Sequence, residues 1–176
     1  MRIAVKLAFD EQAAVRFLNW LAQENALLLR ERPELPLLYE SGVVYRREKN
    51  EVWCDFLNLL AQGHEDCDAL SAARAGELMA RGWKALAPGE PGYRYARRTR
   101  PASIRAEVFL RTRVRPGRVG IYHCVTRYRL KGRWLVDDPS ARLGMYRGLI
   151  DPDIKSRWAR AGVTPRCRPS SNPPGF

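Results

Sequence analysis

The chain has 176 residues, of which 45% are hydrophobic and 28% are charged, as in ordinary globular proteins. This length suits one domain that buries roughly 70% of the surface of its unfolded chain. No apolar run approaches the ~20 residues of a membrane span, and acidic residues come too early for a secretory signal, so we expect a cytoplasmic protein.

The net charge is +12. Such an excess favours polyanionic partners such as nucleic acid, anionic lipid or an acidic protein. The alternative is a solvated arginine surface in a protein from a GC-rich genome, because no nucleic-acid-binding motif accompanies the charge. Basic residues concentrate between Arg94 and Arg118 and again after Arg157.

The first third of the chain is predicted to be mainly helical. Residues 10–31 form a long amphipathic helix that Asp10 caps and Pro33 ends. Residues 38–48 read as a turn followed by a strand or edge segment. Residues 52–60 are predicted to form a second helix before a break at glycine.

Residues 67–81 form a predicted helix with two different faces. One face consists of small residues, which let another element approach closely and suit a central buried helix. The other face carries Arg74, Glu77 and Arg81, of which Glu77 and Arg81 are spaced to pair with each other. Gly82 ends the helix.

The second half of the chain is predicted to be a loop over 83–103 and then a sheet. Alternating apolar residues predict three strands, at residues 105–114, 119–130 and 133–137. Turn dipeptides at residues 116–117 and 131–132 connect them. Helices followed by an antiparallel meander indicate an α+β fold.

The domain organisation follows from these elements. Residues 1–150 are predicted to form a single domain, with a helical extension over 1–50 and a core over 51–150. Residues 151–176 form a Pro/Arg-rich C-terminal tail that we expect to be partly extended or disordered.

Cys67 opens the small-residue helix, where the helix dipole favours the reactive thiolate. The flanking acids Glu65, Asp66 and Asp68 oppose ionisation through like charge. The thiol therefore needs a nearby imidazolium, and without one it is better explained as a small buried residue.

The chain offers two histidines, His64 and His123. If residues 131–132 form a two-residue hairpin loop, Asp138 is a diagonal neighbour of His123 on the same face of the sheet. Asp137 would then point the other way, whereas a three-residue loop would reverse the choice.

Cys67, His123 and Asp138 therefore form a candidate triad of nucleophile, base and orienting carboxylate. The carboxylate would hold the imidazole in one tautomer, and the imidazole would stabilise the thiolate. For the oxyanion, the backbone N–H of Cys67 is a natural donor. Gln62 and Trp53 are further candidates, although an exposed loop glutamine is the plainer interpretation of Gln62.

Two motifs carry a family resemblance. The segment GHEDCDALSAARAGELMARG resembles the cysteine motif of transglutaminase-like proteins, in which Gly-Asp-Cys-Asp-Asp-Leu opens a helix rich in small residues. The segment HCVTRYRLKGRWLVDDPS resembles the second half of that motif, with the family's fifteen-residue step from His123 to Asp138 and its aspartate before proline. The chain departs from the pattern at Glu65 and Ala69.

The resemblance covers residues 53–145 and implies a papain-like fold, with N-terminal helices and a central cysteine-bearing helix on an antiparallel sheet. It implies a cysteine peptidase, amidase or acyl transferase that forms a thioester with a peptide or protein amide and needs no cofactor or metal. The segment order is similar to that of short members encoded by tailed bacteriophages and prophages, which implies incorporation into a virion or a role in assembly or entry.

Two alternatives use the same residues. The chain could be a non-catalytic virion structural or interaction protein that keeps the fold and contacts other virion proteins or DNA through its arginine-rich loop and tail. A zinc site among Cys67, His64, His123 and Cys124 is less favoured, because Cys124 neighbours His123 on a strand and points to the opposite face.

Overall fold

The computed structural model describes residues 2–4, 11–47, 52–113 and 121–145, all within a compact unit that runs to Met145. The predictions for the Asp10 cap, the Pro116-Gly117 turn and the C-terminal tail lie outside these residues. The elements, in chain order, are β1 (Arg2–Ala4), α1 (Glu11–Glu31), η1 (Leu38–Glu40), β2 (Val44–Tyr45), β3 (Val52–Cys54), α2 (Phe56–Gln62), β4 (His64–Glu65), α3 (Cys67–Arg81), η2 (Gly82–Ala85), α4 (Tyr93–Thr99), β5 (Ala106–Arg113), β6 (Ile121–Leu130), β7 (Arg133–Asp137) and α5 (Pro139–Arg142).

The predicted α+β class is confirmed. Strands β5, β6 and β7 form an antiparallel meander, as expected, and two short pairings accompany it. Strand β1 pairs antiparallel with β3, and β2 pairs parallel with β4. In the part of the chain described, no helix has the length and apolar character needed to cross a membrane.

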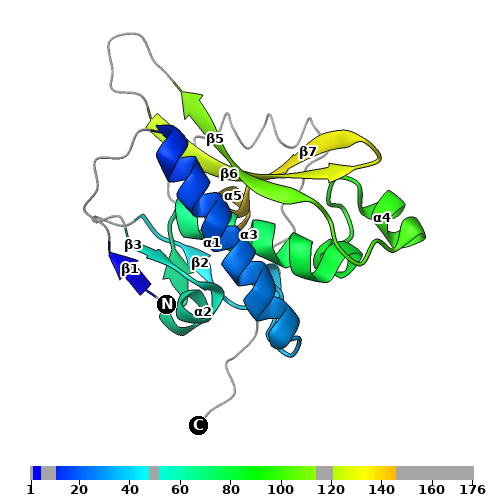
Figure 1. Ribbon diagram of the computed structural model, residues 1–176, viewed down its shortest axis with the longest axis horizontal. Helices are drawn as coiled ribbons and strands as arrows, with labels where there is room; N and C mark the ends of the chain where they lie inside the picture. Colours follow the sequence, from blue (N-terminus) through cyan, green and yellow to red (C-terminus); the bar gives the residue numbers. More distant parts are fainter. Residues whose placement is uncertain (1, 5–10, 48–51, 114–120, 146–176) are drawn as a thin grey trace. The chain divides into compact units, whose positions relative to one another are not determined.

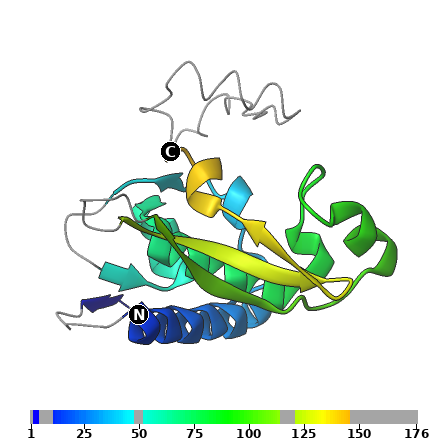
Figure 2. The same cartoon turned by 90° about the horizontal axis from the view of Figure 1, so that it is seen from above.

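Helix α3 is the central element, with α1 packed along it and the sheet β5–β6–β7 against another side (Figures 1 and 2). Helix α1 contributes to the core. Their shared core brings together residues of α1, α3, β5 and β6, among them Leu18, Leu21, Ala72, Ala75, Leu78, Val108 and Tyr128.

The small-residue face of α3 serves the close approach that the sequence predicts. A Cβ atom added at Gly76 would lie 2.6 Å from the Cβ of Asn25 and 2.8 Å from the carbonyl oxygen of Ala22. Both atoms belong to α1, and the second is backbone, so it cannot swing aside. Gly76 therefore sets the distance between the two helices.

Three local predictions need correction. Residues 52–54 form a strand, and α2 begins only at Phe56, because the Asp55 side chain accepts a hydrogen bond from the Asn58 N–H and caps the helix. The predicted loop over 83–103 contains η2 and α4. Helix α4 buries only Ala96, so it leaves no apolar periodicity in the sequence.

The charged face of α3 is the third correction. Arg74 and Glu77 are fully buried, and Glu77 pairs with Arg74 instead of Arg81. Arg81 donates to the backbone carbonyl of Leu35. The apparent polar side of α3 is thus interior, because carboxylates from other segments neutralise its arginine.

We expect Gly76→Ala to destabilise the protein by about 1–3 kcal/mol, the usual cost of overpacking a tight contact. In an exposed helix the same change stabilises by roughly 0.5–1 kcal/mol, so the sign of the effect is diagnostic. Urea unfolding at neutral pH measures it. A Gly76→Ala variant at least as stable as the parent protein would contradict the described contact between α1 and α3.

Candidate functional site

Cys67 is the first residue of α3, and the segment before it is fixed by the end of α2, by a strand pairing and by the cap of α3. Gly63 ends α2 in the left-handed conformation (φ 71°), and β4 then pairs with β2. The Asp66 side chain accepts a hydrogen bond from the Asp68 N–H and caps α3. The thiol is therefore placed at the positive end of a capped helix, as predicted.

His123 and Asp138 meet across the β6–β7 hairpin. Lys131 and Gly132 form the two-residue loop, with φ values of 51° and 74°, and Leu130 pairs with Arg133. The two-residue register is thus confirmed and the three-residue alternative is wrong. His123 Nε2 lies 2.8 Å from Asp138 Oδ2.

This contact shows that the Nε2 atom of the imidazole ring carries a hydrogen. A carboxylate only accepts hydrogen bonds, so Nε2 carries the hydrogen and donates it to Asp138. The Nδ1 atom of His123 is buried and forms no hydrogen bond with the residues that the structure describes. Asp138 is itself oriented, because its Oδ1 accepts from the Ala141 N–H and caps α5.

The thiol of Cys67 is acidified. Hydrogen bonding to Cys124 lowers its pKa most, burial opposes this, and the neighbouring His123 imidazole lowers it further, to about 7. The carboxylate of Asp68 works in the opposite direction, as the flanking acids were predicted to do.

Burial lowers the pKa of His123, but the hydrogen bond to Asp138 and the neighbouring Cys67 sulfur outweigh it and raise the pKa to about 9. Between about pH 7 and about pH 9, the favoured state is therefore a Cys67 thiolate beside a His123 imidazolium. Thiolate is the nucleophilic form of cysteine.

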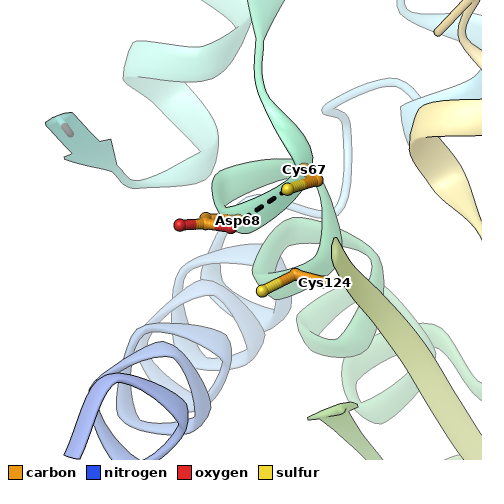
Figure 3. A group of neighbouring side chains, drawn as sticks. All are labelled: Cys67, Asp68 and Cys124. Atoms are coloured by element: carbon orange, nitrogen blue, oxygen red, sulfur yellow. Dashed lines mark hydrogen bonds between the residues drawn. The ribbon is translucent and has the colours of Figure 1, made fainter. Parts of the chain in front are cut away.

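Cys124 is the residue whose contact with Cys67 sequence reasoning missed. It was considered only as a less favoured zinc ligand that points away from the face of His123. Its sulfur nevertheless lies with the sulfur of Cys67 and a carboxylate oxygen of Asp68 in a group whose members are all within 4.8 Å of one another (Figure 3). Its hydrogen bond to Cys67 and its burial raise the pKa of Cys124, so it stays protonated and donates to the Cys67 thiolate. Only its position next to His123 in the sequence hinted at this.

The oxyanion candidates have hydrogen-bond partners already. The Gln62 amide donates to Glu65 Oε1 at 3.0 Å and to the Cys54 sulfur at 3.5 Å. Trp53 Nε1 donates to Asp68 Oδ2 at 3.3 Å, beside Cys67. Trp53 thus binds the carboxylate that also accepts from the Cys67 thiol, and the assignment of either residue to the oxyanion remains a prediction.

His64, the other histidine, pairs with Arg46 at 3.4 Å on the exposed side of β4. It does not belong to the group of possible metal ligands around Cys67 among the residues described. The ligand set considered from the sequence is thus only half assembled, with Cys67 and Cys124 together.

A buried ion network lies behind the site and centres on Arg74 of α3. Its guanidinium contacts Glu77 at 2.6 Å, Glu90 at 2.6 Å and Asp137 at 2.8 Å, and all four side chains are at most 1% exposed. Arg142 of α5 also binds Glu90 and Asp137.

The network is tied to the site through Asp137. This residue faces α3 and is the immediate neighbour of Asp138, whose side chain is directed to His123. The Tyr39 hydroxyl also donates to Asp137, at 2.7 Å. The end of β7, and hence the start of the Asp138 side chain, is anchored to the helix that carries Cys67.

We expect Arg74→Met to destabilise the protein by about 3–5 kcal/mol, because it leaves buried carboxylates without their cation. Urea unfolding measures the loss. As a matched control, Arg32→Met removes an exposed arginine that pairs with Glu34, and should leave the unfolding midpoint nearly unchanged. Equal small effects of both substitutions would contradict the structural role of the network.

Comparison with known proteins returns no match of any of the three kinds sought: no family model, no curated protein and no solved structure matches the chain. The case for a function therefore depends on the geometry of Cys67, His123 and Asp138.

Proposed function

We propose that the protein is a cysteine hydrolase or acyl transferase of the transglutaminase-like type, acting on peptide or protein amides. The observation that carries the proposal is the 2.8 Å contact between His123 Nε2 and Asp138, made by an imidazole that also lowers the pKa of the Cys67 thiol. A nucleophile, a base and a group that orients the base are the parts that covalent acyl transfer requires.

The first half of the reaction forms a thioester. The Cys67 thiolate attacks the amide carbonyl carbon, a C–S bond forms, and the carbonyl π electrons move to oxygen. As the tetrahedral intermediate collapses, the C–N bond breaks and His123 passes a proton from Nδ1 to the leaving amine. The Cys67 N–H at the start of α3 is the proposed donor to the oxyanion.

The second half releases the acyl group. His123, now neutral, removes a proton from water or from an incoming amine, and the oxygen or nitrogen attacks the thioester carbonyl. The C–S bond breaks, the sulfur leaves as thiolate, and His123 is again the imidazolium. Water gives hydrolysis and an amine gives transamidation, so the reaction type depends on which nucleophile reaches the thioester.

Several features support the family-level part of the proposal. The nucleophile opens a central helix, the base lies on an antiparallel strand, and the orienting aspartate follows the next strand. This is the order of elements that the resemblance implies. The prediction for Asp138 from hairpin geometry and the residue implied by the family motif coincide.

The first test is selective alkylation. At neutral pH we expect iodoacetamide to modify Cys67 at least about tenfold faster than Cys54, a buried thiol that donates to Glu65. The rate should rise with pH through an inflection near pH 7, because the pKa of Cys67 is about 7 and the thiolate fraction grows above it. Peptide mass spectrometry resolves the sites.

Two variants separate the roles of the partners. His123→Ala removes the cation that stabilises the thiolate, so the inflection should move to higher pH. Asp138→Asn should lower the pKa of His123 and have a smaller effect in the same direction. Equal, slow modification of all cysteines, unchanged in His123→Ala, would reject the enzymatic proposal.

That negative result would favour the second candidate, a non-catalytic structural protein that contacts polyanions, such as a virion component. One observation supports it: α4 presents Arg94, Arg97 and Arg98 to solvent within a single short helix. An exposed guanidinium cluster suits phosphate contacts, and its binding should weaken steeply with added salt.

A further inference from the structure

The site contains a second arrangement of side chains, which shares only Cys67 with the proposed triad. Sulfur atoms of Cys67 and Cys124 and one carboxylate oxygen of Asp68 lie within 4.8 Å of one another, contributed by the start of α3 and by β6 (Figure 3). The proton transfers of the proposed reaction use His123 and Asp138. Cys124 takes no part in them and only stabilises the Cys67 thiolate, and Asp68 opposes the ionisation of Cys67.

The spacing suits a tetrahedral ion. Zinc binds sulfur at about 2.3 Å and carboxylate oxygen at about 2.0–2.2 Å, so neighbouring ligand atoms around it are roughly 3.5–4 Å apart. The three atoms are already within 4.8 Å, and small side-chain rotations would close the difference. When zinc binds, it displaces the protons of both thiols. The resulting set of two thiolates and one carboxylate is one that zinc prefers over magnesium or calcium.

The carboxylate is held in place for such a role. Trp53 Nε1 donates to Asp68 Oδ2 at 3.3 Å, which leaves Oδ1 directed at Cys67, 3.2 Å from the sulfur. In metal sites, hydrogen bonds from residues that do not touch the ion orient the side chains that bind it. Cys67 and Asp68 are half-buried and Cys124 is buried, so the group lies between the surface and the core.

We propose that Cys67, Asp68 and Cys124 bind a thiophilic divalent cation, represented by Zn²⁺, through three protein ligands and leave a fourth position for water. A bound ion would occupy the sulfur of Cys67 and so prevent its attack on a substrate. The binding site stands on the positions of these atoms and does not depend on the proposed function.

The experiment uses the full chain, reduced and freed of metal. Zn²⁺ is titrated against a chromophoric chelator, and Co²⁺ is added separately to detect sulfur-to-cobalt charge transfer. We expect one equivalent to bind, with Cys67→Ser and Cys124→Ser each weakening affinity at least about 100-fold, and Asp68→Asn about tenfold. Circular dichroism verifies that each variant folds. If a serine variant does not fold, the affinity of Asp68→Asn for Zn²⁺ still tests the proposal.

Two control variants make the outcome specific. Cys54→Ser removes a buried thiol outside the group and should bind Zn²⁺ like the parent protein. His123→Ala should also keep the metal while losing fast alkylation of Cys67, so the metal site and the enzymatic proposal can fail separately. Absence of stoichiometric binding, or binding that survives both Cys67→Ser and Cys124→Ser, would overturn the inference.

Discussion

One fully buried guanidinium, that of Arg74, is the interaction on which the arrangement of the site depends. It binds carboxylates from its own helix, from the segment between η2 and α4, and from the end of β7. A charge removed from water is tolerated only while its partners remain in place, so these segments cannot separate without a large loss of free energy. The helix that carries Cys67 and the hairpin that carries His123 are thereby joined.

The two aspartates at the end of β7 face in different directions. Asp137 faces the buried network, and the next residue, Asp138, faces His123. Neighbouring residues at a strand end project in opposite directions. Asp137 can therefore stabilise the fold through Arg74 while Asp138 orients the imidazole of His123. At the sulfur, His123 and Cys124 favour the thiolate while Asp68 opposes it, which leaves the pKa of Cys67 near neutrality.

Sequence reasoning was strongest where local rules decide the structure. The length of α3, the strand Arg133–Asp137 and the Lys131-Gly132 loop all follow from caps, alternation and turn chemistry, and they suffice to pair His123 with Asp138. It failed where distant segments decide. Nothing local to α3 shows that Glu90 and Asp137 will neutralise Arg74, and strand alternation around Cys124 gives no hint of the helix start that meets it.

The most direct test of the central claim, that a thiolate–imidazolium pair exists at Cys67 and His123, is a titration of the histidine ring nitrogens by ¹⁵N NMR. The chain has two histidines, so a His64→Gln variant assigns the signals. The structure predicts that His123 stays protonated until about pH 9 and that its pKa falls in Cys67→Ala. Titration near the ordinary pKa of histidine, unaffected by Cys67→Ala, would contradict it.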